Sequence, residues 1–450
     1  MSPETTEPTP PAPTADEDRD DASADAPIED VASVDAGSLA KQILAGTGRF
    51  EHVDCAGVSL AKQRVEGALE FVHCRFTRLD CKKTKFAGPV TFRHCRIEDS
   101  AFSNATFEGP VLFEHCQIAL RRPWVGLTAK ATFAVRSCRF EGKTTFEGCK
   151  FHGRFDGWDS RVLGWGDFVR CTWDGECDLR SMHFAEGLVF KGCAFAEDVL
   201  MRGASVQMKL AFEQTKLGGT LDLQKAKLHD YTYLDGLEWG ERATLRVWNA
   251  ILRAVLVKPN QIAGRLASER EGDFGKATEE YGVLKTNYAG LNWFDEEDWA
   301  YYHMKRVRRL ARARAGEGGF TGRIARTADW LIFDKACAYG TSPLRVLASS
   351  MLTIFGFACL YAIPLFAASD VSYSTLEPTG YFHPYRITGV PRLDGVITCG
   401  IGSASSFVSG FDGVDKNVEG WVALALTVES LAGMLLLGLF IVSFSRKVIR

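Results

Sequence analysis

Large apolar residues recur along residues 41–257 in steps of five, and every fourth step is lengthened to six. One stretch of this pattern runs through Phe71, Phe76, Cys81, Phe86, Phe92, Ile97, Phe102, Phe107 and Phe113. A second small or apolar residue usually stands two positions earlier, as Cys74 does before Phe76. An amphipathic helix needs steps of three and four, and a half-buried strand needs strict alternation. The pattern fits neither, and the return of the same steps from Phe71 to Phe92 and from Phe92 to Phe113 indicates a solenoid.

The longer step carries a glycine each time, at Gly67, Gly88 and Gly109. Beyond an interruption near residues 121–135, the pattern tightens to pairs of apolar residues, and each member of the pair recurs every 11 residues. The first members are Phe168, Leu179, Phe190, Met201, Phe212 and Leu223, and the second are Trp173, Phe184, Phe195, Val206, Leu217 and Leu228. Two inward positions per unit predict a right-handed quadrilateral β-helix from about residue 45 to 257. Its large inward residues include Phe71, Phe76, Phe86, Phe92, Phe107, Phe113, Phe146, Phe190 and Phe212.

This five-residue unit, small-x-Leu/Phe-x-x, resembles the repeat of the pentapeptide-repeat family, which implies that each unit forms one side of the β-helix. Ten of the thirteen cysteines fall in the same frame. Eight take the small inward position (Cys74, Cys95, Cys116, Cys138, Cys149, Cys171, Cys177, Cys193) and two the large one (Cys55, Cys81). A buried free cysteine behaves as a small hydrophobe. We therefore expect these ten to be reduced and unpaired, which places the solenoid in the cytoplasm.

Four histidines recur with the same period, at His52, His73, His94 and His115. Coils of a β-helix stack ~4.8 Å apart, so we expect these residues to form a surface ladder. Histidine ligates metals and titrates near neutral pH, which makes a metal or pH-sensing role one interpretation. The other is that similar residues stack comfortably, and it is favoured because no carboxylate recurs beside them in step. We expect no metal and no cofactor.

Two apolar stretches, 344–366 and 421–444, each exceed the ~18–20 residues needed to cross a bilayer. Basic residues lie outside both, in a cluster at 305–326 and at Arg446, Lys447 and Arg450. The loop 370–419 holds six acids against three bases. The positive-inside rule then predicts a two-span protein of the cell membrane with both termini cytoplasmic.

The rest of the chain divides by composition. Residues 1–35 carry eleven acids against one arginine and few large apolar residues, so residues 1–40 are expected to be a disordered acidic, proline-rich tail. Residues 41–257 are the β-helix, and 258–340 are a helical connector with helices near 276–288 and 295–314. The basic juxtamembrane end of this connector is expected to lie at the bilayer interface. Residues 341–450 are the transmembrane domain.

A short apolar segment, about 395–414, lies between the spans and is predicted to be re-entrant. Span, re-entrant helix, glycine-containing loop and span together resemble the two-helix pore of potassium channels joined to pentapeptide repeats. The residues at the filter-like position are Ser409, Gly410, Phe411, Asp412 and Gly413. An aspartate stands where the potassium filter has its second glycine, so a queue of inward carbonyls is not expected. The resemblance implies a degenerate, less selective cation path in a homo-oligomer, a tetramer if channel-like.

Glu429 is the one charge inside the second span, and an intramembrane charge indicates a functional site by default. It either lines a pore or pairs between subunits, or it is a protonated carboxyl that bonds between helices of an oligomer, and both interpretations imply oligomerisation. Two function classes follow. One is a channel-like pore attached to a cytoplasmic β-helix, and the other is a non-conducting membrane-anchored scaffold whose β-helix docks an unknown cytoplasmic protein.

Other functions find little support in the residues. No nucleophile elbow, phosphate-binding loop or zinc-protease motif is present, so we expect no catalytic residues and no enzyme activity. Residues 41–257 hold 31 lysines and arginines against 26 acids, which argues against an acidic surface that imitates DNA. The expected partners are therefore the lipid bilayer, further copies of this chain and a protein, but no nucleic acid.

Overall fold

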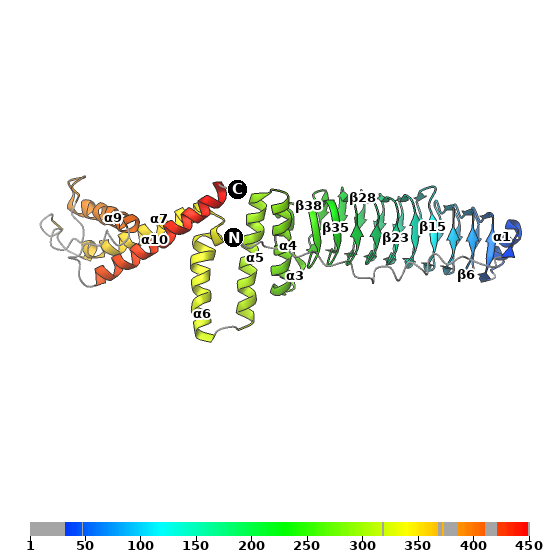
Figure 1. Ribbon diagram of the computed structural model, residues 1–450, viewed down its shortest axis with the longest axis horizontal. Coiled ribbons are helices and arrows are strands. Elements are labelled where there is room, and N and C mark those ends of the chain that lie inside the picture. Colours follow the sequence, from blue (N-terminus) through cyan, green and yellow to red (C-terminus); the bar gives the residue numbers. More distant parts are fainter. Residues whose placement is uncertain are drawn as a thin grey trace, which may run out of the picture. The chain divides into compact units, whose positions relative to one another are not determined.

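A computed structural model of the chain describes residues 32–46, 48–316, 319–367, 371–372, 385–409 and 421–448. The chain divides into two compact units, Met1–Glu297 and Asp298–Arg450. The first unit is a ladder of short strands with helices at its ends, and the second is helical (Figure 1).

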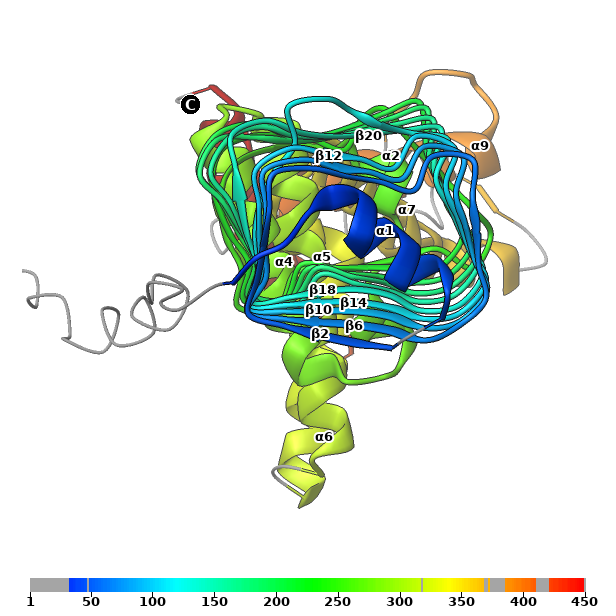
Figure 2. The same ribbon diagram turned by 90° about the vertical axis from the view of Figure 1, so that its right-hand side faces the viewer.

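The strands of the first unit pair in parallel with strands one coil away. Phe92, for example, pairs in register with Phe71 of the preceding coil and with Phe113 of the following one. Viewed along its length, the unit has four sides (Figure 2). The predicted fold class, a β-solenoid followed by helices, is confirmed.

Four sheets make up these sides. The ten-stranded sheet contains β2 (Arg49–Glu51), β6 (Leu69–Val72), β10 (Val90–Arg93), β14 (Val111–Glu114), β18 (Phe133–Arg136), β22 (Phe155–Asp156), β26 (Cys177–Asp178), β30 (Val199–Leu200), β34 (Thr220–Asp222) and β37 (Thr244–Arg246). The nine-stranded sheet contains β5 (Arg64–Val65), β9 (Lys85–Phe86), β13 (Thr106–Phe107), β17 (Thr128–Ala129), β21 (Lys150–Phe151), β25 (Thr172–Trp173), β29 (Ala194–Phe195), β33 (Thr215–Leu217) and β36 (Leu237–Trp239).

The remaining strands form a small sheet and a large one. The three-stranded sheet contains β4 (Val58–Ser59), β8 (Leu79–Asp80) and β12 (Ser100–Ala101). The 16-stranded sheet begins with β1 (Ala32–Ser33), β3 (Val53–Cys55), β7 (Arg75–Phe76), β11 (Arg96–Ile97), β15 (Gln117–Ala119), β19 (Arg139–Glu141), β23 (Arg161–Val162), β27 (His183–Phe184), β31 (Ser205–Val206) and β35 (Lys227–Tyr233). It continues from β35 through β32 (Leu210–Glu213), β28 (Leu188–Lys191), β24 (Gly166–Val169), β20 (Thr144–Glu147) and β16 (Trp124–Val125), and β38 (Ile251–Leu256) also pairs with β35.

The solenoid runs without a gap through residues 121–135, where the sequence pattern predicted an interruption. Val90 pairs with Val111, but Val111 pairs with Phe133, which is one position later than the spacing of the earlier coils would give. The irregularity is therefore one added residue per coil, and it accounts for the changed interval between the later apolar pairs. The four-residue strands β6, β10, β14 and β18 lie in the sheet that contains β2 and β37. The four-residue strands that follow, β20, β24, β28 and β32, lie on the side that contains β16.

Stacked aromatic rings fill the solenoid. All nine predicted large inward residues are at most 3% exposed. The rings of Phe92 and Phe113 are 4.8 Å apart and 2° from parallel, and those of Phe146 and Phe168 are 4.9 Å apart. Each such side chain contributes roughly 1.5–3 kcal/mol on burial, so a column of them stabilises every coil through its neighbours.

The N-terminal end of the solenoid is covered by a short helix, α1 (Ala36–Leu44), which lies across the opening in Figure 2. β1, which precedes α1 in the sequence, pairs with β3. The side chain of Asp35 caps α1 by accepting a bond from Ser38 N, and Leu39 and Ile43 are buried. The segment expected to be disordered through residue 40 is thus ordered from Ala32, because two apolar residues one turn apart cover the first coil.

The other end is covered by α2 (Pro259–Ile262), α3 (Ala267–Arg270) and α4 (Phe274–Gly290). α4 lies against β38, whose outer edge would otherwise expose unpaired backbone groups. The side-chain amide of Asn287 supplies both missing bonds, because Val255 N donates to its Oδ1 at 2.7 Å and its Nδ2 donates to Val255 O at 2.8 Å. The buried amide thus imitates a further strand.

The second unit contains most of α5 (Phe294–Arg314), then α6 (Gly319–Ala328), the π-helical segment η1 (Asp329–Ala336) and the short 3₁₀ turn η2 (Ala338–Gly340). Three longer helices follow in the described residues: α7 (Pro343–Ala367), α9 (Pro391–Ser409) and α10 (Trp421–Val448). α7 and α10 are long and apolar enough to cross a membrane. Both agree with the predicted spans within a few residues. α9 covers residues 395–409 of the segment predicted to be re-entrant, and 410–414 lie outside the described residues.

Candidate functional site

α9 packs against both candidate spans, and small or hydroxyl-bearing residues make the contacts. Ser403 Oγ on α9 donates to Ile354 O of α7 at 2.8 Å. Ser430 Oγ on α10 donates to Ser406 O of α9 at 3.2 Å. Gly433 allows the closest approach, because a Cβ there would lie 2.1 Å from the carbonyl oxygen of Phe407. Small residues at a crossing are what close packing of membrane helices requires.

Glu429 lies at the centre of this three-helix contact and is fully buried. Tyr361 of α7 donates its hydroxyl to Glu429 Oε2 at 2.8 Å, and Ser403 of α9 is hydrogen-bonded to Oε1. One carboxyl therefore bonds to both neighbouring helices. These bonds join helices of a single chain, and the two interpretations of Glu429, which differ in its role between subunits, both stay predictions.

The hydrogen-bond pattern indicates how the proton at this site is held. The single hydroxyl proton of Ser403 lies within reach of two acceptors, Ile354 O and Glu429 Oε1. Both contacts are satisfied if Ser403 donates to Ile354 O and a protonated Glu429 donates to Ser403 Oγ. A neutral carboxyl is also the form that a buried site away from cations favours.

A buried aspartate fixes the start of α9. Asp394 is fully buried and accepts bonds from Thr388 N at 2.7 Å, Thr388 Oγ1 at 2.8 Å and Ile387 N at 3.2 Å. These donors precede the helix in sequence, so the carboxylate holds the entering chain against the first turn of α9. The sequence interpretation counted Asp394 only as one acid of the outer loop.

The filter-like residues are mostly beyond the described part of the chain. Ser409 is the last residue of α9, and its hydroxyl donates to Ser405 O at 2.5 Å. Gly410, Phe411, Asp412 and Gly413 lie outside the described residues.

The four predicted histidines form a stack on the solenoid. Successive ring centroids in the series His52, His73, His94, His115 are 5.2, 4.9 and 5.0 Å apart, and the planes lie within 11° of parallel. Each residue occupies a corner with φ between 51° and 53°. Partial burial, and then the adjacent His115 and His73, lower the pKa of His94 below its usual value. The stack therefore favours the neutral form of His94.

No group of three or more histidine, cysteine, aspartate or glutamate side chains suited to a metal ion occurs in the part of the chain that the structure describes. The ladder is held by stacking contacts between neighbouring imidazoles. Its geometry is that of equivalent corner residues in successive coils.

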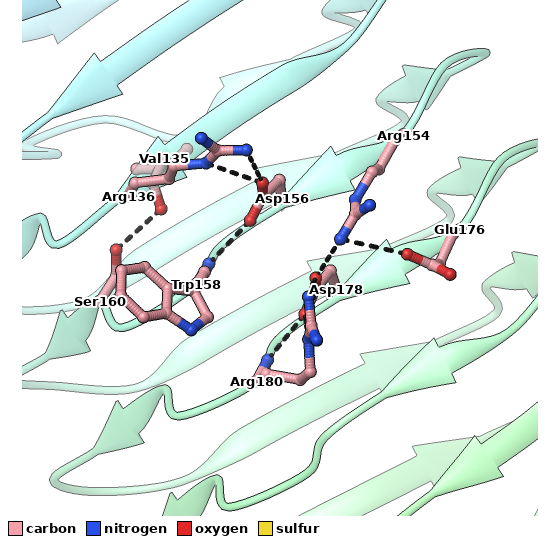
Figure 3. Close-up of polar contacts among 9 residues, drawn as sticks. All are labelled: Val135, Arg136, Arg154, Asp156, Trp158, Ser160, Glu176, Asp178 and Arg180. Atoms are coloured by element: carbon pink, nitrogen blue, oxygen red, sulfur yellow. Dashed lines mark hydrogen bonds and ion pairs between the residues drawn. The ribbon is translucent and has the colours of Figure 1, made fainter.

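Two buried aspartates that the sequence interpretation missed lie on neighbouring strands, β22 and β26 (Figure 3). Asp156 accepts two bonds from Arg136, from Nε at 2.8 Å and Nη2 at 2.5 Å. It also accepts a bond from the backbone N–H of Trp158, at 3.2 Å. The carboxylate thus holds the following corner.

Asp178, one coil further, repeats the arrangement with two arginines. Arg180 donates its Nη2 at 2.6 Å and its backbone N at 3.1 Å, and Arg154 is bonded to the same carboxylate (Figure 3). Burial alone would raise the pKa of Asp178, but the bonds from Arg180 and Arg154 outweigh it and hold the pKa below its usual value. These saturated carboxylates stabilise corners and are unsuited to proton transfer. The signal that could have revealed them is that Asp156 and Asp178 occupy the same position of successive coils.

Residues 65–117 match a family model described as pentapeptide repeats, with nine copies. No curated protein and no solved structure matches the chain. The match covers only part of the solenoid, but the same parallel pairings extend on both sides of it, from β2 to β37. The chain therefore carries pentapeptide repeats together with two candidate membrane-spanning helices.

Proposed function

We propose that this chain is an integral membrane protein in which α7, α9 and α10 form a channel-like pore domain of a homo-oligomer, with the β-helix on the cytoplasmic side. The observation that carries the proposal is the position of α9. A helix too polar to count as a span is packed between two apolar ones and joined to both by Ser403 and Ser430. Such a layout is that of a short pore helix held by its two flanking spans.

The outer faces of the spans support membrane insertion. Leu352 and Phe355 on α7 are 71% and 68% exposed, and Leu424 and Ile441 on α10 are 67% and 64% exposed. Water would make such a surface costly, whereas lipid or a second subunit would cover it. Two helices per chain cannot surround an axis, so permeation requires several copies.

A second function, a non-conducting membrane-anchored scaffold, is favoured by Glu429. A carboxyl that bonds to Tyr361 and Ser403 of its own chain already has a packing role and needs no pore to explain it. In this case the three helices serve as an anchor, and the solenoid surface is the functional part.

Single-channel recording of the purified wild-type protein in a planar bilayer separates the two functions. Under the pore proposal we expect cation currents, and Glu429→Gln should change the conductance or its pH dependence because it alters the contact between α9 and both spans. Thr427→Val is the matched control, since this hydroxyl donates to Ala423 O of its own helix, at 2.8 Å. No current for any monovalent cation over a broad pH and voltage range would establish the scaffold instead.

A further inference from the structure

A cavity of about 720 Å³ lies within the second unit, among α5, α6, η1, η2 and the last third of α10. Its size is in the range of small-molecule sites. Basic side chains dominate the polar part of its lining: Lys305, Arg308, Arg309, Arg312 and Arg326. Asp329 is the one acidic residue in the same lining, as far as the described residues show.

The acids beside this cavity are already bonded. Asp334 accepts from Arg309 Nη2 at 2.5 Å and from the Tyr302 hydroxyl at 2.8 Å, and Asp329 accepts from the Tyr339 hydroxyl at 2.9 Å. The other terminal nitrogen of Arg309, Nη1, is buried and has no hydrogen-bond partner among the described residues. The lining therefore combines an excess of positive charge with a buried donor that lacks an acceptor, and both features favour the binding of an anion.

The apolar part of the lining includes residues of a candidate span. Leu439 and Val442 of α10, together with Phe333 of η1, complete the cavity. Roughly 20 helical residues cross the hydrocarbon core, so a span that begins at Trp421 reaches the far interface near these residues. Arg446 and Lys447 follow within two turns. The cavity thus lies at the level where headgroups meet acyl chains.

We propose that this cavity binds the headgroup of an anionic phospholipid, an inference that rests on the proposed membrane insertion. Arginine guanidinium groups match phosphate oxygens in charge and geometry, and Arg308 and Arg312 lie one turn apart on α5. Leu439 and Val442 would meet the first carbons of the acyl chains. A soluble phosphate has the same polar chemistry but leaves this apolar wall uncovered.

The test uses the full-length protein purified in neutral detergent, with native mass spectrometry to count bound lipids. The probes are phosphatidylglycerol, phosphatidylcholine and inorganic phosphate. We expect one retained phosphatidylglycerol per chain, no retained phosphatidylcholine, and no competition by inorganic phosphate. Arg308→Gln with Arg312→Gln should lower phosphatidylglycerol affinity about tenfold or more, because charge-assisted hydrogen bonds are lost.

The matched control is Arg306→Gln with Arg314→Gln, which removes the same charge from α5 at exposed positions outside the cavity lining. Equal losses in the two pairs would mean diffuse surface attraction and would overturn the site. Displacement by inorganic phosphate would make it a soluble-anion site and would overturn the lipid assignment. Resistance of the wild type to alkaline extraction from membranes tests insertion separately, so a failed lipid site and a failed membrane proposal are distinguishable.

Discussion

Glu280 on α4 is a buried carboxyl whose ionisation should affect stability. It is fully buried and accepts a bond from Val247 N at 3.2 Å. Desolvation by burial raises its pKa to about 7, against a weaker opposing contribution from the Val247 bond. Below pH 4.5 the carboxyl is neutral in both states. Between pH 4.5 and 7 only the unfolded state ionises readily, so stability falls as pH rises, and above pH 7 the full cost is present.

Glu280→Gln should therefore stabilise the protein at pH 8 by up to about 3 kcal/mol, with little effect at pH 4. Urea unfolding followed by the circular dichroism of the solenoid measures this difference. Glu279→Gln is the control, because that neighbouring side chain is exposed and bonds to Trp248 Nε1. Equal stabilisation at both pH values would contradict the titration argument.

The inward cysteines act as small hydrogen-bonding hydrophobes. All ten in the solenoid are free and buried. Cys95 Sγ donates to Phe71 O of the preceding coil at 3.4 Å, and Thr84 Oγ1 makes the equivalent bond to Leu60 O at 2.7 Å. Burial raises the pKa of the Cys95 thiol, which further lowers its thiolate fraction.

Thiol labelling at Cys95 should therefore be slow in the native protein and fast in denaturant. Mass spectrometry of the labelled peptide as a function of time measures both rates. Rapid native labelling would show that this inward position is accessible and would contradict the assigned register.

At the scale of the element, the glycines of the six-residue step are required by the spacing of coils and not by backbone angles. A Cβ at Gly88 would lie 2.5 Å from Gly67 O, and one at Gly109 would lie 2.7 Å from the carbonyl carbon of Gly88. Gly148 differs, because its φ is +60° and no atom lies within 4 Å of its Cβ position. Asn104 occupies an equivalent corner with φ 55°.

Gly88→Ala should separate two coils and destabilise the solenoid by roughly 1–3 kcal/mol, as overpacking does elsewhere. Gly148→Asn should change stability by less than about 0.5 kcal/mol, since asparagine tolerates the left-handed region. The urea concentrations at the unfolding midpoints of the two variants measure these two changes in stability. A larger loss for Gly148→Asn would show that backbone angle, and not coil spacing, selects these glycines.

The side-chain amide of Asn287, which pairs with the outer edge of β38, gives a second prediction at the scale of the element. Asn287→Leu would leave Val255 N–H and C=O buried without partners, at a cost of about 2–5 kcal/mol. Thr286→Ala, one residue earlier and exposed, should change stability by less than about 0.5 kcal/mol. Hydrogen exchange of the Val255 amide measures the local effect. Unchanged protection in the leucine variant would mean that α4 covers the edge without this amide.

The sequence predicts what is periodic and misses what is not. Phe92 and Cys95 could be assigned inward because every coil repeats their environment. The cap α1 rests on only Leu39 and Ile43, and Asn287 contacts the distant Val255 in a pattern that does not repeat from coil to coil. Glu429 was recognised as an unusual charge, but its partners Tyr361 and Ser403 lie on other helices and carry no sequence signal.

At the scale of the whole molecule, the contacts of α5 bear on membrane topology. Arg345 at the start of α7 lies 5.6 Å from the ring of Tyr302, and Arg446 at the end of α10 lies 4.6 Å from the ring of Tyr301. Arg446 also pairs with Asp298 at 2.8 Å. The start of α7 and the end of α10 thus meet the same part of α5, so under the proposed membrane insertion both ends would lie on one side.

Under the proposed membrane insertion, the positive-inside rule predicts that this side is the cytoplasm, because the basic cluster of α5 and the residues after α10 are both there. We therefore expect a fluorescent reporter fused after Arg450 to be active, and a phosphatase that works only outside the cytoplasm to be inactive. The same two reporters inserted within the loop 370–419 should give the opposite result. An active phosphatase after Arg450 would reverse the topology.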